Sequence, residues 1–490
     1  MSRLSAATSG QLPAAVEQPL YDRAAMTCGV VHLGIGAFHR AHQAVIFDDV
    51  LNRGDPRWGI VAASLRSPTV REQMVPQDGL YSVLVRDGQS ESCRIVGAVR
   101  DVLVAPEQPQ ALLAALAHPD THIVTLTITE KGYKLDPATG ALIEDDPQMA
   151  ADLAGLAVPQ TAPGFLVAAL AMRRAAGVPP FTAISCDNLP HNGSRLRAAV
   201  IALARRHDAA LADWIASWGS FPETMVDRIV PATTQADIAA MAQSLGVEDR
   251  AMVKTEPFCQ WVIEDSFCGP RPDFGDAVQI TRSVAPWEEA KLRLLNGAHS
   301  GIAYLGGLAA IDYVHEVLAL PAARAFVEQL WDEAQATLSP PPELDVAAYR
   351  RALMARFDNP ALQHGTRQIA MDGSQKLPQR LLAPIAARLQ AGGSIDALSL
   401  AVAAWVRWQG ARDDRGEAYV VDDPLAGAIA ARLEGLSDAA ARVDAIMGLE
   451  AVFPVALRDD ERLRQSLTRW LRILDEKGAQ GALETFASEK

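Results

Sequence analysis

Apolar runs and short alternating segments dominate the chain up to about residue 285. Four runs are apolar and of strand length, which predicts buried strands of a parallel sheet at 29–33, 58–65, 122–129 and 181–185. Helical spacing predicts helices within 107–117 and near 164–176, and alternation at 81–86 and 93–99 predicts a hairpin. Strands that alternate with helices predict an α/β fold.

From residue 286 onward the apolar spacing becomes helical. Eight stretches predict helices, at 301–311, 322–337, 346–356, 382–391, 396–409, 424–434, 438–448 and 459–487. We therefore expect two domains: an α/β domain over residues 1–285 and a mainly α-helical domain over residues 286–490.

A glycine turn follows the first predicted strand and suggests that this domain binds a dinucleotide. The turn consists of Gly34, Ile35, Gly36, Ala37 and Phe38. It opens a helix predicted to run through Asp48 and Asp49, where a doubly wound, Rossmann-type fold binds a pyrophosphate. His39 replaces the third glycine of the usual G-x-G-x-x-G pattern, so an ordinary strand-to-helix turn is the alternative.

The end of the second predicted strand lacks the acid that usually holds the adenosine ribose, because no carboxylate occurs between Ser64 and Glu72. Arg66 is a candidate contact for a 2′-phosphate or for the adenine ring. A surface arginine with neither role is an equal alternative. This loop leaves the choice between NAD and NADP open.

Other strand ends carry polar residues that would face the same crevice of a parallel sheet. Glu130 and Lys131 follow the run at 122–129, and Asn188 follows the run at 181–185. Asp227 lies with Arg228 in an apolar, strand-like segment, where both charges need partners. A surface ion pair is the alternative for Glu130 and Lys131, and an ordinary turn is the alternative for Asn188.

The segment 286–300 predicts a helix with a functional face. Pro286 suits a first helical turn, and at about 100° per residue four side chains fall on one face. They are Glu288, Lys291, Asn296 and His299. A lysine base, amide donors and a hydride-accepting cofactor suffice for metal-free alcohol oxidation, provided that burial lowers the pKa of the lysine. A solvated polar stripe is the alternative.

A polar stretch at 364–380, which we expect to be a loop, carries the cations Arg367, Lys376 and Arg380 around an Asp-Gly pair. Together with Lys131, Lys376 and Arg380 are candidates for binding an anionic substrate end. Solvated charges are an equal alternative.

Composition narrows the function classes. The net charge of −14 argues against nucleic acid and anionic membranes as partners. Five scattered cysteines without metal-ligand spacing fit reduced thiols, no metal site and a cytoplasmic location. Residues 1–28 contain no apolar stretch of signal length, and no apolar run reaches the roughly 18 residues of a membrane anchor, so we expect neither export nor anchoring.

Seven segments occur in the order and spacing of one known family. They are HLGIGAFHRAHQA, LTITEKGY, SCDNLPHNG, TMVDRIVP, EPFCQWVIED, KLRLLNGAHS and DGSQKLP. On them the chain resembles the mannitol dehydrogenase family of polyol-specific long-chain dehydrogenases, from about residue 29 to near the C-terminus. The resemblance implies a Rossmann-type domain before a helical one, zinc-independent hydride transfer and catalysis by a lysine, two asparagines and a histidine. By motif these are Lys291, Asn188, Asn296 and His299, with Glu288 gating proton exchange.

Within the family, the stretch RQIAMDGSQKLPQRLL is most similar to the D-mannonate oxidoreductases, also called fructuronate reductases. That resemblance implies a sugar-acid substrate and NAD, with NADP not excluded. A mannitol or arabinitol dehydrogenase and a non-catalytic dinucleotide sensor are the alternatives, although the intact lysine, asparagine and histidine set argues against a sensor. The sequence leaves the oligomeric state undetermined, and a monomer is one option.

Overall fold

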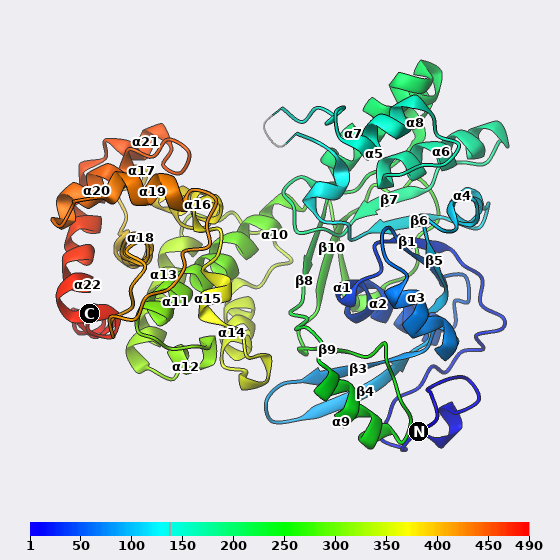
Figure 1. The fold of residues 1–490 in the computed structure, drawn as a ribbon, viewed down its shortest axis with the longest axis horizontal. Coiled ribbons are helices and arrows are strands. Elements are labelled where there is room, and N and C mark those ends of the chain that lie inside the picture. Colours follow the sequence, from blue (N-terminus) through cyan, green and yellow to red (C-terminus); the bar gives the residue numbers. More distant parts are fainter. Residues whose placement is uncertain (137–138, 490) are drawn as a thin grey trace. The chain divides into compact units, whose positions relative to one another are not determined.

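The computed structural model describes residues 1–136 and 139–489 (Figure 1). The chain forms two compact units, Met1–Val284 and Ala285–Lys490. Below they are called unit 1 and unit 2.

A five-stranded parallel sheet forms the centre of unit 1. Its order is β5-β2-β1-β6-β7. The strands are β1 (Val30–Leu33), β2 (Ile60–Ser64), β5 (Val99–Val104), β6 (Ile123–Leu126) and β7 (Thr182–Ser185). Strand order reverses between β1 and β6, and ligands of such sheets bind at the carboxyl ends near this reversal. This arrangement confirms the Rossmann-type sheet.

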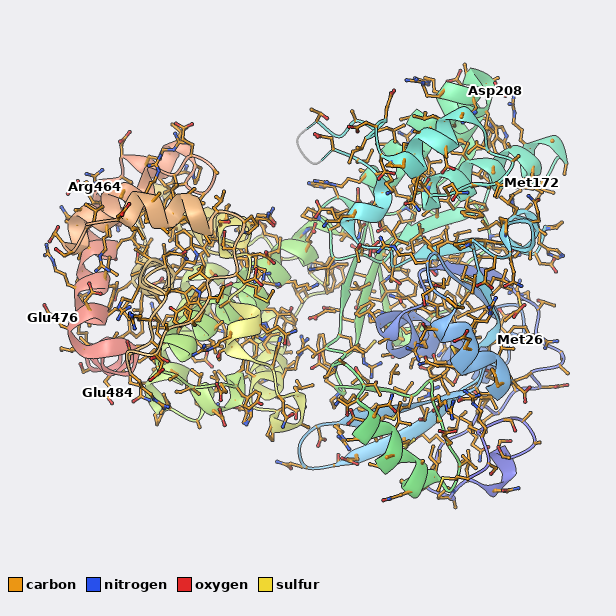
Figure 2. The ribbon with its side chains drawn as sticks, viewed as in Figure 1. Met26, Met172, Asp208, Arg464, Glu476 and Glu484 are labelled. Atoms are coloured by element: carbon orange, nitrogen blue, oxygen red, sulfur yellow. The ribbon has the colours of Figure 1, made fainter. Side chains whose placement is uncertain are left out.

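Helices cover both faces of this sheet. Successive strand residues point to opposite faces, so Val30 packs into one apolar cluster with α2 while Val31 packs into the other with α4, α6 and α7. The helices of unit 1 are α1 (Ala37–Ala41), α2 (Gln43–Asn52), α3 (Thr69–Met74), α4 (Pro109–Ala117), α5 (Pro147–Ala154), α6 (Ala162–Ala175), α7 (Asn192–His207), α8 (Ala209–Trp218) and α9 (Gln235–Leu245). Asp208, labelled in Figure 2, caps α8 by accepting a hydrogen bond from the Ala210 amide.

Two small sheets complete unit 1. The predicted hairpin is confirmed as β3 (Tyr81–Arg86) and β4 (Glu91–Val96), which pair antiparallel, and β9 (Val253–Thr255) joins β3. The other sheet has the order β11-β10-β8, with β8 (Thr224–Asp227), β10 (Gln260–Glu264) and β11 (Val278–Thr281).

Unit 2 is helical in its described part, as expected. Its helices are α10 (Ala285–Ala290), α11 (Gly297–Leu308), α12 (Val314–Leu318), α13 (Pro321–Gln335), α14 (Val346–Phe357), α15 (Thr366–Ile369), α16 (Gly373–Leu377), α17 (Ala383–Gln390), α18 (Asp396–Trp408), α19 (Ala426–Leu433), α20 (Ala439–Met447), α21 (Val455–Arg458) and α22 (Glu461–Ser488). Every residue of α11 is buried. Its glycines permit this, because a Cβ at Gly307 would lie 2.6 Å from the Trp408 ring of α18.

Three elements differ from the prediction. The helix after Gly36 breaks at His42, whose φ of −123° and ψ of −90° are not helical. The apolar run at 122–129 ends as a strand at Leu126. The Thr127 amide still bonds to the Leu33 carbonyl oxygen, but the Ile128 and Thr129 amides bond to the Asp187 side chain from another loop. The cationic stretch at 364–380 is largely helical.

Among the described residues, no helix is both long enough and apolar enough for a bilayer crossing.

Candidate active site

The glycine turn after β1 leaves room for a ligand. Gly34 has a φ of 99°, and a Cβ there would lie 2.1 Å from the Thr127 carbonyl oxygen, so no other residue fits. Gly36 is different, because beyond its chain neighbours the nearest atom to its Cβ position is the Gly34 carbonyl oxygen at 3.8 Å. The fold therefore needs glycine at position 34, whereas the open space at position 36 fits a pyrophosphate close to the backbone.

His39, at the third glycine position, packs under this turn. Its ring stacks on the His32 ring with centroids 3.4 Å apart, and both side chains are buried. The His32 ring nitrogens lie 2.8 Å from the Thr125 hydroxyl and 3.0 Å from the Thr127 hydroxyl, and Thr127 donates to the Gly34 carbonyl oxygen. Burial lowers the pKa of His32 to about 3 and holds that of His39 well below its usual range. Two neutral rings thus fill the space between helix and sheet.

A cavity of about 230 Å³ opens beside this turn at the carboxyl ends of β1, β2 and β6. Its lining includes Gly34, Arg66 and Lys131. The described residues that line it do not include Glu130, whose carboxylate lies 3.9 Å from the Arg195 guanidinium on the surface. The structure thus puts Lys131 beside the glycine turn, in unit 1, whereas Lys376 and Arg380 belong to unit 2.

Asp187, in the loop after β7, connects this loop to the segment after β6 through side-chain hydrogen bonds. Its carboxylate accepts hydrogen bonds from the Ile128 amide (3.1 Å), the Thr129 amide (2.8 Å) and the Tyr133 hydroxyl (2.6 Å). These bonds hold Thr129 at a φ of 64°, which a β-branched residue rarely adopts. Burial raises the pKa of Asp187. Asp187 was not among the residues predicted from the sequence, although a carboxylate at a strand end, just before Asn188, is a signal that could have identified it.

The loop after β7 also holds the candidate residue Asn188. The Asn192 amide group donates to the Asp187 carbonyl oxygen (3.1 Å) and to the Thr224 carbonyl oxygen (2.9 Å). The backbone before Asn188 is therefore fixed from both sides. Asp227 lies buried at the end of β8.

In unit 2 the candidate residues lie on a distorted helical run. Pro286 occupies the first turn of α10, as expected. The segment η5 (Lys291–Asn296) is π-helical, and the Gly297 amide donates to the Leu292 carbonyl oxygen five residues back. The regular α-helical wheel was therefore wrong for this turn. A π-helical turn holds more residues than an α-helical turn, so Lys291 and Asn296 lie closer in angle than the α-helical wheel predicts.

Lys291 and His299 are both only 7% exposed. The His299 ring lies 4.6 Å from the Phe357 ring and 5.0 Å from the His364 ring, centroid to centroid. Burial, followed by the charges of His364, Arg356 and Arg380, holds the pKa of His299 well below its usual range, so the imidazole is neutral. The buried Asn296 side-chain oxygen has no hydrogen-bond partner among the described residues and remains available as an acceptor.

The three predicted cations of unit 2 have different surroundings. Arg367 lies 3.5 Å from the Asp413 carboxylate. The Lys376 ammonium donates to the carbonyl oxygens of Ile369 and Met371, and burial lowers its pKa.

Arg380 lies on a second π-helical segment, η7 (Pro378–Leu382). It donates to the Ser300 hydroxyl at 3.2 Å, and within the described part of the chain no carboxylate pairs with it. Burial lowers its pKa to about 10, so it stays charged at neutral pH. The segment η7 packs closely against the start of α11, because a Cβ at Gly297 would lie only 3.0 Å from the Arg380 carbonyl oxygen.

Across residues 1–136 and 139–489, no three His, Cys, Asp or Glu side chains gather as a candidate metal site.

Comparison with known proteins identifies relatives along the whole chain. The family described as "Mannitol dehydrogenase Rossmann domain" matches residues 28–275, and "Mannitol dehydrogenase C-terminal domain" matches residues 283–474. The D-mannonate oxidoreductase of Escherichia coli is 41% identical over 472 residues, which cover 95% of this chain and 97% of the relative. The mannitol 2-dehydrogenase of Pyrenophora tritici-repentis is also 41% identical, over 96% of this chain and 84% of the relative. A structure of Pseudomonas fluorescens mannitol 2-dehydrogenase in complex with NAD and D-mannitol has a TM-score of 0.84 and 36% identity, with full coverage of both chains.

Proposed function

The chain belongs to the mannitol dehydrogenase family of oxidoreductases, and on that premise we propose that it interconverts D-mannonate and D-fructuronate with NAD. The reaction removes a hydride from a secondary alcohol carbon and a proton from its oxygen. The nicotinamide supplies the acceptor, or in reverse the donor, of the hydride. The relatives support a polyol or a sugar acid as substrate, and the choice between these two rests on the side chains below.

Lys291 is proposed as the general base that takes the hydroxyl proton on its Nζ. Its burial supports this role, because the proton transfer would take place away from bulk water. Asn296, at the other end of the same π-helical segment, and Asn188 are proposed to stabilise the developing alkoxide through their amide groups. The neutral His299 orients the hydroxyl. Glu288 keeps the role that its motif implies, exchange of the proton with solvent.

The glycine turn is proposed to hold the dinucleotide. Gly34 shapes the turn, the open side of Gly36 admits the pyrophosphate, and Ile35, Ala37 and Phe38 supply backbone at the start of α1. Arg66 is proposed to contact the adenosine part of the cofactor. Glu130 remains a prediction, with its exposed ion pair to Arg195 as a plainer role.

Arg380 is the observation that carries the sugar-acid assignment. Its charge is partly desolvated, it has only the Ser300 hydroxyl as its described side-chain partner, and it packs against the helix start that follows Lys291 and Asn296. A substrate carboxylate would supply the missing countercharge through charge-assisted hydrogen bonds. Lys376, held by carbonyl oxygens, is the secondary candidate, and Asp227 remains a prediction for a substrate contact. Lys131, also predicted as a substrate contact, lines the same cavity as Gly34 and Arg66, which favours a contact with the cofactor instead.

The test compares the acid with its neutral analogue. We expect kcat/KM for reducing fructuronate to exceed that for fructose by about 10-fold to 100-fold. Arg380→Met should remove most of this ratio, with a smaller loss for Lys376→Met. Arg367→Met is the matched control, because Arg367 already pairs with Asp413.

Equal rates on acid and neutral sugar would refute the sugar-acid assignment and favour a mannitol 2-dehydrogenase. So would a preference for the acid that survives Arg380→Met, Lys376→Met and Lys131→Met together.

A further inference from the structure

The cavity beside the glycine turn carries positive charge without a carboxylate to balance it. Three cations line it, Arg66, Lys131 and Lys134. Lys134 is neutralised by the Asp146 carboxylate at 2.7 Å. Arg66 and Lys131 are exposed, and no described carboxylate lies within ion-pair distance of either. Two of the three cations that line this cavity therefore have no carboxylate partner among the described residues.

The end of β2 provides no acid for the ribose. Ser64 is the last residue of this strand, and its hydroxyl lies within hydrogen-bond distance of the backbone amides of Arg66 (3.4 Å) and Ser67 (3.2 Å). An acid at this place would hold the ribose hydroxyls of NAD and would repel a phosphate on the ribose, whereas an arginine nearby accommodates that phosphate.

We propose that the cavity accepts a phosphate monoester on the adenosine ribose, so that the chain binds NADP as well as NAD, with Arg66 as the main contact and Lys131 as the second. The guanidinium of Arg66 suits the phosphate oxygens because it offers parallel N–H donors. This inference rests on the proposed function, in that it needs a dinucleotide at the glycine turn.

Binding of cofactor fragments tests the inference without any turnover. Isothermal titration calorimetry should compare ADP-ribose with 2′-phospho-ADP-ribose. We expect the wild-type chain to bind the phosphorylated fragment at least as tightly as ADP-ribose. Arg66→Ala should weaken the phosphorylated fragment by about 10-fold to 100-fold, and Lys131→Ala by less, while ADP-ribose affinity stays within about 3-fold.

Two further variants sharpen the test. Arg71→Ala is the matched control, because Arg71 lies on α3 outside the cavity lining and pairs with Glu107 at 2.6 Å. It should leave both affinities unchanged. Ser64→Asp introduces the missing acid and should reverse the preference towards ADP-ribose.

The inference is overturned if the wild-type chain binds 2′-phospho-ADP-ribose 10-fold or more weakly than ADP-ribose. It is also overturned if Arg66→Ala lowers both affinities alike. If neither fragment binds, the dinucleotide site fails and this inference fails with it; ADP-ribose binding alone would leave the proposed function standing. Unchanged thermal unfolding of Arg66→Ala, an exposed position, would show that its binding loss is not a folding defect.

Discussion

Unit 1 presents its candidate residues from loops at the carboxyl ends of parallel strands, whereas unit 2 presents them from within helices. In unit 1 the loops are shaped by glycine and by side chains that bond to backbone amides, as Asp187 does for Ile128 and Thr129. In unit 2 the helical backbone satisfies its own hydrogen bonds, and a π-helical turn re-aims Lys291 and Asn296. Loop geometry therefore depends on a few identifiable side chains, and helix geometry on a local shift of register.

This difference fits the proposed roles of the two units, which are cofactor binding for unit 1 and proton transfer for unit 2. A cofactor that binds by its phosphates needs backbone close to the ligand, which glycine loops provide. Proton transfer needs a buried base with a fixed neighbour, which a packed helix provides. Substitutions in unit 1 should therefore change cofactor affinity, and substitutions in η5 and α11 should change the chemical step.

Lys291→Ala should give the largest effect. Loss of a general base should lower kcat by about 100-fold to 10,000-fold, because the proton then has no acceptor in place. Cofactor affinity should stay within about 3-fold. Steady-state kinetics and calorimetry measure the two quantities. A kcat within about 3-fold of wild type, with an unchanged pH profile, would remove Lys291 from the mechanism.

Gly36→Val should separate binding from folding in unit 1. Gly36 has a φ of −108°, which valine adopts readily, and its Cβ position is open. Thermal stability should therefore be retained while the new side chain blocks the pyrophosphate, with an expected loss of about 100-fold in NAD affinity. Gly34→Ala is the contrasting variant and should destabilise the fold, since its Cβ would collide with the Thr127 carbonyl oxygen. Unimpaired NAD binding by Gly36→Val would place the cofactor elsewhere.

Asp187→Asn should test how far unit 1 depends on one loop-shaping side chain. An amide cannot accept all three hydrogen bonds, so the free energy of unfolding should fall by about 2 to 3 kcal/mol. Tyr133→Phe removes one of the three bonds and should cost about 1 kcal/mol. Urea unfolding measures both. Asp120→Asn, at an exposed site beside His118, is the control and should change little. A neutral Asp187→Asn would mean that other contacts hold Thr129 in its unusual conformation.

His364 should give unit 2 a small, pH-dependent weakness. Burial lowers its pKa to about 4, below the unfolded value of about 6.5, so only the unfolded state takes up a proton as the pH falls through this interval. Stability is thus unaffected above pH 6.5 and lost below it, by about 1 to 2 kcal/mol at pH 5.

The measurement is a double difference. Urea unfolding at pH 7 and pH 5 is compared for wild type and His364→Leu. The His364 Nδ1 has no hydrogen-bond partner among the described residues, so the substitution breaks no hydrogen bond at that atom. Carboxylates whose pKa is raised by burial, such as Asp187, act in both proteins and cancel. Equal pH dependence in the two proteins would show that His364 titrates normally.

Much of the fold could be predicted because local pattern and tertiary environment agree. The runs that became β1, β2 and β7 are apolar on both faces, as a sheet covered by helices requires, and the helical periods of unit 2 recur within a few residues of their predicted ends. The strand prediction for 122–129 was wrong at its end, because β6 ends at Leu126. Its Thr and Ile residues favour strand, but two hydrogen bonds from the Ile128 and Thr129 amides to Asp187 outweigh that preference.

The sequence by itself determined the two-part architecture, the place of the glycine turn and the candidate chemistry of Lys291, Asn296 and His299, because these depend on residue type and short-range order. Only the tertiary structure decided that the turn before Gly297 is π-helical, that His39 stacks on His32, that Lys131 belongs beside Arg66, and that Arg380 lacks a carboxylate partner in the described chain. Each of these depends on side chains brought together from distant positions, which no local pattern records.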